Sequence, residues 1–280
     1  MVREAGDPTG TPVLYFHGTP GCRLDVAVGD EIAATLGVRV ISFDRPGYGG
    51  SDGAPFGLRR IAEDAEAVAD SCGLARFATM GWSGGGPYAL AAAAAMGDRV
   101  TRVGVACGPG PFQRVPGALD RLGDGDLEAL SYLPDQPERA AAQFCVGSEV
   151  MVAVREDEQA LMSGMDAVFG GVDADVLADP AMRHHLFVTM SEALRQGFMG
   201  VGWDNVAWVG EWDIEVAAVR CPVNLWYGAG DQMMPVANGE WLEHHLRDAE
   251  LTIYADEGHL LLLRHWPDML RALLPGRSHV

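Results

Sequence analysis

Residues 77–96 read FATMGWSGGGPYALAAAAAM, and this stretch decides the fold. Its first six residues are mostly apolar, which predicts a buried strand over 77–82. Glycines follow Ser83, and the alanine-rich run after them predicts a helix over 84–96. A tight strand-to-helix turn lifts a serine hydroxyl clear of the sheet and points the next backbone N–H groups at a developing oxyanion. The stretch therefore predicts that Ser83 is a nucleophile.

The pattern G-x-S-x-G occurs a second time, around Ser51. Here the flanking residues are DRPGYGG and GAP, which predict loop on both sides rather than a strand and a helix. Ser51 is therefore interpreted as a turn residue.

Strands and helices alternate on both sides of the Ser83 turn. Short apolar runs predict strands, and amphipathic stretches predict helices. The strands are expected at 12–16, 38–43, 102–107, 222–227 and 251–254, and the helices at 24–36, 57–72, 236–247 and 260–274. Such alternation implies right-handed crossovers and a parallel sheet flanked by helices, so the predicted fold class is α/β.

The middle of the chain has a different pattern. It shows helical stretches near 136–168 and 180–197 and no convincing strand. We therefore predict a core made of residues 1–110 and 211–280, with residues 111–210 inserted as a helical cap.

Five short motifs occur in an order that resembles the α/β-hydrolase superfamily. They are His17–Gly21, Asp44–Ser51, Gly81–Gly85, Gly228–Asp231 and Glu257–His259. In that family they correspond to an oxyanion loop, a turn after the next strand, the nucleophile elbow, the acid loop and the histidine loop.

The resemblance implies a serine hydrolase. Ser83 would attack an acyl carbon, His259 would take its proton, and Asp231 would orient the imidazole. The order Ser, Asp, His along the chain is the one this fold uses. The backbone N–H groups of Thr19 and Gly84 would form the oxyanion hole.

Other candidates for these roles are weaker. Asp256 and Glu257 lie too close to His259 in sequence to reach its far ring nitrogen. Cys22 has no paired base and is expected to pack in the interior. Of the other histidines, His17 is expected to support its loop, and surface positions are expected for His184, His185, His244 and His245. Neither histidine pair has metal-ligand spacing, so no metal is predicted.

Members of this family usually carry two more strands at the N-terminus. Only residues 1–10 precede the first clear apolar run. We therefore expect the N-terminal edge strands to be missing or reduced, with a homodimer as one way to cover the edge.

Composition excludes several classes of function. The net charge of -19 disfavours binding to nucleic acid and to anionic membranes. Five scattered cysteines without a C-x-x-C pair indicate neither a disulfide framework nor a zinc site, and no apolar run resembles a signal peptide or a membrane span. The expectation is a cytoplasmic protein that acts on a small-molecule acyl substrate. No cofactor is expected, because acyl transfer needs none.

Several reactions remain open. A serine at the elbow disfavours dehalogenases and epoxide hydrolases, which use aspartate there. The leading hypothesis is cleavage of a small apolar carboxylic ester through an acyl-enzyme on Ser83. Alternatives are an aminopeptidase resembling proline iminopeptidases, a lactonase or C–C hydrolase, and a non-catalytic ligand-binding receptor. The aminopeptidase would need acidic groups, for which the candidates are Glu149, Glu156, Asp157, Glu158, Asp166 and Glu192.

The insertion is expected to supply the walls of the substrate pocket. Methionine and aromatic side chains there predict an apolar substrate of modest size. The candidates are Met151, Met162, Met165, Phe169, Phe187, Met190, Phe198, Met199, Trp203 and Trp208. Trp82 is expected to pack beneath the elbow.

Overall fold

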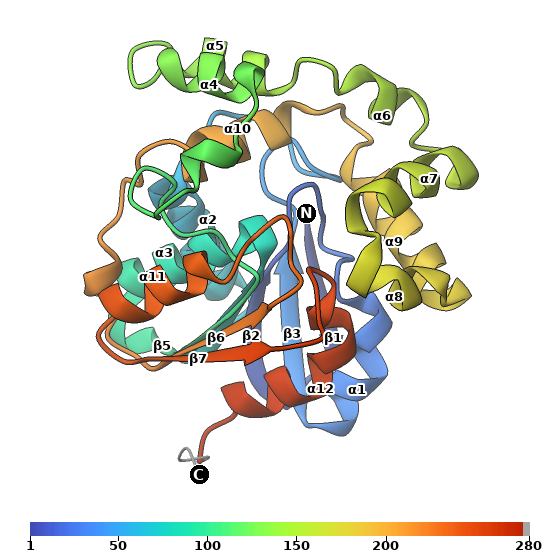
Figure 1. Cartoon of the computed structure of the whole chain (residues 1–280). Coiled ribbons are helices and arrows are strands. Elements are labelled where there is room, and N and C mark those ends of the chain that lie inside the picture. Colours follow the sequence, from blue (N-terminus) through green and yellow to red (C-terminus); the bar gives the residue numbers. More distant parts are fainter. Residues whose placement is uncertain (277–280) are drawn as a thin grey trace.

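A computed structural model describes residues 1–276 and is built on one seven-stranded sheet (Figure 1). The strands follow the spatial order β1-β3-β2-β4-β5-β6-β7, and every pair is parallel except β1 with β3. Their bounds are β1 Val2–Gly6, β2 Thr11–Phe16, β3 Val38–Phe43, β4 Phe77–Trp82, β5 Val100–Ala106, β6 Val223–Gly228 and β7 Ala249–Tyr254. The predicted α/β class with a mostly parallel sheet is confirmed.

The edge strand β1 was not predicted. It pairs antiparallel with β3, from Val2 opposite Phe43 to Gly6 opposite Arg39. Its sequence VREAG is polar because an edge strand has little surface to bury, so a search for apolar runs passes over it. An ion pair from Arg39 to Glu4 (2.5 Å) ties it to its neighbour. The N-terminal edge is therefore reduced rather than absent, and the homodimer stays a prediction.

Helices cover both faces of the sheet. On one face, α1 (Asp30–Thr35) and α12 (Leu261–Leu273) enclose a core that includes Tyr15 and Trp266. On the other face lie α2 (Leu58–Ser71), α3 (Gly86–Met96) and α11 (Ala237–His245). The small side chains of Ala89, Ala91, Ala92 and Ala93 are all buried and let α3 pack closely between the sheet and α2.

Between β5 and β6 the described chain contains helices and no strand. These are α4 Asp124–Ser131, α5 Pro137–Phe144, α6 Glu149–Ala153, α7 Glu158–Phe169, α8 Ala174–Ala178, α9 Pro180–Ala193 and α10 Met199–Trp208. They arch over one end of the sheet (Figure 1). The predicted helical span 136–168 divides into α5, α6 and α7, and the first break includes Gly147 in a left-handed conformation (φ +84°).

Candidate active site

Ser83 occupies a strained turn directly after β4. Its φ of +52° lies in the left-handed region, which residues with a Cβ seldom adopt. The turn is possible because Gly81 and Gly85 lack side chains: a Cβ on Gly81 would collide with the Gly85 carbonyl, and one on Gly85 with the Phe16 carbonyl. The short turn Ser83–Gly85 then leads into α3.

Three side chains from separate loops form one hydrogen-bonded line at the carboxyl ends of the strands. Ser83 follows β4, Asp231 follows β6 and His259 follows β7. Ser83 Oγ lies 2.9 Å from His259 Nε2, and His259 Nδ1 lies 2.8 Å from Asp231 Oδ2. All three residues are buried. The structure thus brings together the three side chains that the motifs single out.

Asp231 is held as a carboxylate. Burial alone would raise its pKa, but the nearby His259 and the hydrogen bonds to the carboxylate outweigh burial and lower the pKa. The second carboxylate oxygen accepts the N–H groups of Met233 (2.8 Å) and Met234 (2.9 Å). Since the carboxylate only accepts, His259 donates from Nδ1 and leaves Nε2 free to accept the Ser83 hydroxyl proton.

The His259 ring and backbone are fixed by residues on both sides. Phe169 stacks on the imidazole, with ring centroids 5.7 Å apart. Trp82 donates from Nε1 to the His259 carbonyl (3.0 Å). Asp173 accepts the N–H of His259 (2.8 Å) and of Leu260 (3.3 Å), and burial raises the pKa of Asp173. Sequence reasoning missed Asp173, since no motif marks an acid between α7 and α8.

Thr19 and Gly84 lie against each other beside Ser83. A Cβ on Gly84 would collide with Thr19 Oγ1, so only glycine lets the loop after β2 approach this closely. His17 supports that loop, as expected: its Nε2 accepts the Arg45 N–H at 3.1 Å, and its Nδ1 lies 2.8 Å from the Gly18 carbonyl. Burial, and then the Arg45 charge, lower the pKa of His17 well below its ordinary value.

A buried ion pair connects the same loop to α10. Asp204 on α10 binds the Arg45 guanidinium through both oxygens, at 2.9 Å and 2.7 Å, and also accepts the hydroxyl of Thr19 (2.6 Å). Tyr48 (2.5 Å) and Tyr88 (2.7 Å) donate to the same carboxylate. Arg45 donates further to the carbonyls of residues 17 and 18. A full set of hydrogen bonds is what allows a buried charge pair to persist.

Asp25 ties the loop from within. Its carboxylate accepts the N–H of Gly18 (2.7 Å) and of Cys22 (3.1 Å). Burial raises the Asp25 pKa to about 7, against these two donors and Arg45, which lower it.

This raised pKa predicts how stability depends on pH. Between about pH 4 and about pH 7 the folded chain binds a proton on Asp25 that the unfolded chain releases. The contribution of Asp25 to the free energy of unfolding is therefore fully present below pH 4. It is lost as pH rises to about 7, by at most about 1.4 kcal/mol per pH unit. We expect the variant Asp25→Asn to flatten this slope in urea unfolding measured across that range. Asp52→Asn, at an exposed position, is the control. An unchanged slope in Asp25→Asn would contradict the assignment.

A cavity of about 180 Å³ opens onto Ser83 and His259. Four of the ten proposed cap side chains border it: Met151, Met165, Phe169 and Met190. Trp82 also borders it. A second cavity of about 520 Å³ lies next to the first, and Met233 lines both. Trp208, another of the ten, lines this second cavity.

The remaining candidates lie elsewhere. Asp256 is exposed, and Glu257 pairs with Arg264 and His265. Ser51 donates to the Asp44 carbonyl (2.8 Å), as a turn residue does. Cys22 is buried, and burial raises its pKa, so its thiol is not activated. His184, His244 and His245 are exposed.

His185 corrects the expectation of a surface position. It is half-buried, and its Nε2 lies 2.8 Å from the Asp25 carbonyl. His279 lies outside the described residues.

One group of possible metal ligands occurs within residues 1–276. Donor atoms of Cys107, Asp231 and His259 lie within 4.8 Å of one another. Burial raises the pKa of the Cys107 thiol, whereas metals bind the thiolate, and the other two residues already bind each other. We assign no metal to this group.

Comparison with known proteins places the chain in a family. The model of the alpha/beta hydrolase fold matches residues 11–265. The chain belongs to the alpha/beta hydrolase fold family. The resemblance seen in the motifs is thereby confirmed.

Two curated relatives of this α/β-hydrolase carry the same name, pimeloyl-[acyl-carrier protein] methyl ester esterase. The protein of Aromatoleum aromaticum is 32% identical over 169 residues, which cover 51% of this chain and 67% of the relative. The protein of Chromobacterium violaceum is 27% identical over 272 residues, 94% of this chain and 93% of the relative.

Solved structures share the fold of this α/β-hydrolase. An esterase from Exiguobacterium antarcticum superimposes with a TM-score of 0.69 at 18% identity, covering 97% of this chain and 93% of that one. An alpha/beta hydrolase fold protein from Nakamurella multipartita gives 0.64 at 22% identity, covering 97% and 95%.

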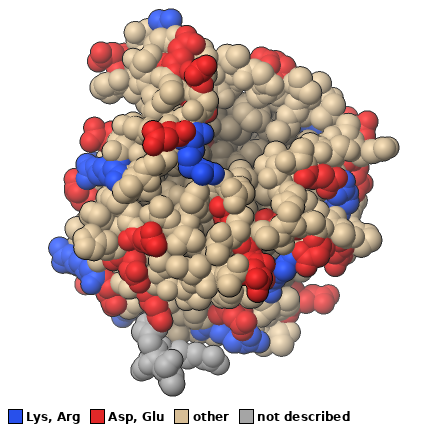
Figure 2. Space-filling view, viewed as in Figure 1, with Lys and Arg blue, Asp and Glu red and all other residues tan. Residues whose placement is uncertain are grey.

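The surface matches the acidic composition. Figure 2 shows acidic side chains spread over the visible face, with fewer basic ones among them. Among the described helices, none is both long and apolar enough to cross a bilayer.

Proposed function

We propose that this chain hydrolyses small carboxylic esters through an acyl-enzyme on Ser83. The observation that carries the proposal is the line Ser83–His259–Asp231 at the wall of an apolar cavity. A hydroxyl bonded to a neutral imidazole, itself held by a carboxylate, is the arrangement that activates a serine.

The reaction proceeds in two halves. Ser83 Oγ attacks the ester carbonyl carbon while its proton passes to His259 Nε2. The tetrahedral intermediate expels the alcohol, whose oxygen receives that proton. A water molecule then gives a proton to His259 and attacks the acyl carbon, which releases the carboxylic acid and returns the proton to Ser83.

In this mechanism the backbone N–H groups of Thr19 and Gly84 bind the oxyanion. Three features support these two positions: their contact beside Ser83, the tether of Thr19 to Asp204, and the tie of the neighbouring Gly18 to Asp25. The N-terminal end of α3, which follows the turn, adds favourable potential for negative charge.

The ester bond is the bond type best supported. The two curated relatives are named for hydrolysis of a methyl ester. The cavity of about 180 Å³ suits a small, largely apolar substrate. Five free cysteines fit a reducing compartment, and a cytoplasmic location is part of this proposal.

The aminopeptidase alternative has less support. It needs a carboxylate at the cavity to hold a substrate amine. None of the six acidic candidates borders the cavity. Five of them pair with arginine or histidine or cap a helix, and the sixth, Glu149, is exposed. Asp25 borders the cavity, but two backbone N–H groups already occupy its oxygens.

Labelling with a fluorophosphonate, followed by peptide mapping, tests the proposal. We expect one labelled site, Ser83, and turnover of short-chain esters. Ser51→Ala is the matched control, because Ser51 lies in the other G-x-S-x-G pattern and should not affect labelling. A folded chain that takes no label would overturn the proposal and favour the ligand-binding alternative.

A further inference from the structure

Thr189 on α9 borders the cavity of Ser83 and has a polar atom without a partner. Its side-chain oxygen bonds to none of the residues 1–276, and Thr189 is only 6% exposed. Its neighbours along the same wall, Leu186 and Met190, are apolar. A buried hydroxyl normally has a hydrogen-bond partner, because leaving it unpaired is unfavourable. This hydroxyl is therefore available to whatever enters the cavity.

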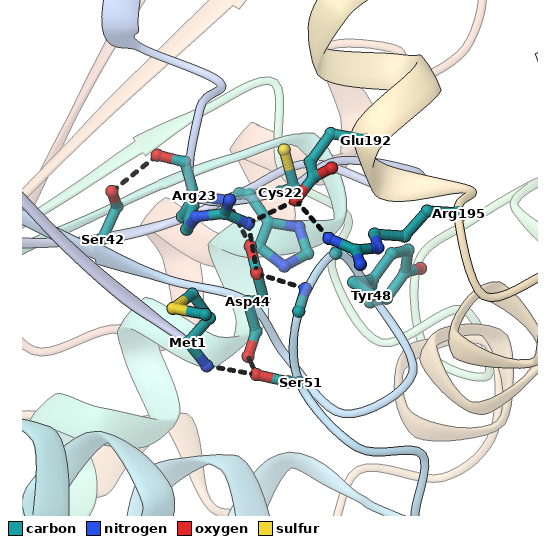
Figure 3. Close-up of polar contacts among 12 residues, drawn as sticks. Met1, Cys22, Arg23, Ser42, Asp44, Tyr48, Ser51, Glu192 and Arg195 are labelled. Carbon is teal, nitrogen blue, oxygen red and sulfur yellow. Dashed lines mark hydrogen bonds and ion pairs between the residues drawn. The ribbon is translucent and has the colours of Figure 1, made fainter. Parts of the chain in front are cut away.

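The position of Thr189 is fixed by the helix that carries it. One face of α9 contacts the loop after β2 at three successive turns. The Thr189 carbonyl accepts the Cys22 thiol (3.5 Å), and His185 lies 2.8 Å from the Asp25 carbonyl. Arg23 bridges Glu192 (2.8 Å) and Asp44 (2.6 Å), as Figure 3 shows. Because this loop also carries Thr19, these contacts fix the position of the Thr189 hydroxyl relative to the proposed oxyanion hole.

The cavity offers few other polar groups to a ligand. The Ser83 hydroxyl and the His259 ring are hydrogen-bonded to each other, and both carboxylate oxygens of Asp25 accept hydrogen bonds from backbone N–H groups. Most of the remaining lining is methionine, phenylalanine, leucine and valine. One hydroxyl on an apolar wall recognises one polar atom at a defined place in an otherwise apolar molecule.

We propose that Thr189 determines substrate specificity by donating a hydrogen bond to an oxygen of the substrate remote from the scissile ester. The inference rests on the proposed ester hydrolysis and names its substrate class: small esters with one additional carbonyl-type oxygen. A site that bonds a polar group discriminates against the analogue lacking that group, because its own polar atom is then left unpaired.

Matched pairs of esters test this. In the first pair, methyl oxopentanoate carries a ketone in the acyl part that methyl pentanoate lacks. In the second pair, oxobutyl acetate carries a ketone in the alcohol part, whereas butyl acetate has no ketone. We expect the wild-type chain to prefer the keto ester of one pair in kcat/KM. We expect Thr189→Val, which replaces the hydroxyl by a methyl group of similar size, to lower that preference about 10-fold.

Two comparisons separate this role from a structural one. The preference is the ratio of two kcat/KM values measured on one protein sample, so a smaller folded fraction lowers both values equally and leaves the ratio unchanged. The intrinsic reactivity of each ester is the same for every variant, so it cancels when the ratios of two variants are compared. Thr189→Ser keeps the hydroxyl and should restore the preference. If Thr189→Val hydrolyses both members of both pairs in the wild-type ratio, the inference is wrong. If the wild-type chain hydrolyses no ester, the proposed function itself fails.

Discussion

Replacing Ser83 by alanine should abolish ester turnover while the chain stays folded. We expect kcat to fall by about 10⁵-fold or more, because the nucleophile and the first proton donor are removed together. The fold should survive, since alanine has the same Cβ as serine and adds no atom to the strained turn. Steady-state kinetics with the best ester measures the loss, and thermal unfolding checks the fold.

The second serine makes this test specific. Among residues 1–276, the hydroxyl that Ser51→Ala removes bonds to the Asp44 carbonyl and the N-terminal amine alone, so turnover should stay near the wild-type value. Turnover that persists in Ser83→Ala and disappears in Ser51→Ala would show that the nucleophile has been assigned to the wrong pattern.

Changing Asp231 to asparagine should lower kcat by about 10⁴-fold with little change in shape. The amide cannot stabilise the imidazolium, and its NH₂ group favours the wrong tautomer of His259. The same change removes the carboxylate whose pKa the structure lowers. The measurement is kcat under saturating ester, with the melting temperature as a check on folding.

Asp173 provides the matched comparison for Asp231. Its carboxylate also lies near His259, but its hydrogen bonds come from the backbone N–H groups of His259 and Leu260 and not from the imidazole ring. Asp173→Asn keeps one oxygen acceptor and should lower kcat far less than Asp231→Asn. The reverse ranking, or a large loss in the exposed Asp256→Asn, would refute Asp231 as the carboxylate that orients His259.

The sequence predicted the parts of this site that local patterns encode. Ser83 lies where an apolar strand meets a glycine turn and a helix. This order of elements exposes the serine hydroxyl and directs the next backbone N–H groups toward an oxyanion. Asp231 and His259 each follow a strand, and parallel strands bring their carboxyl ends to one edge. Those rules need only the chain itself.

The residues that support the site could not be found this way. Asp173, Thr189 and Asp204 come from a helical segment whose only sequence signal is periodicity, and periodicity does not say which side chain meets which loop. β1 could not be predicted from apolar runs, because this edge strand buries little surface and its sequence is largely polar. These contacts depend on tertiary packing, which no local window contains.

The Arg45–Asp204 ion pair also limits which helices from other hydrolases could replace those between β5 and β6. The Asp204 carboxylate on α10 accepts hydrogen bonds from an arginine, two tyrosines and the threonine beside the proposed nucleophile. A chimera that received its helices from another hydrolase without this acid would enclose an uncompensated guanidinium against the loop that carries Thr19. We therefore expect functional recombinants between relatives to preserve Asp204 together with Arg45 or to replace both at once.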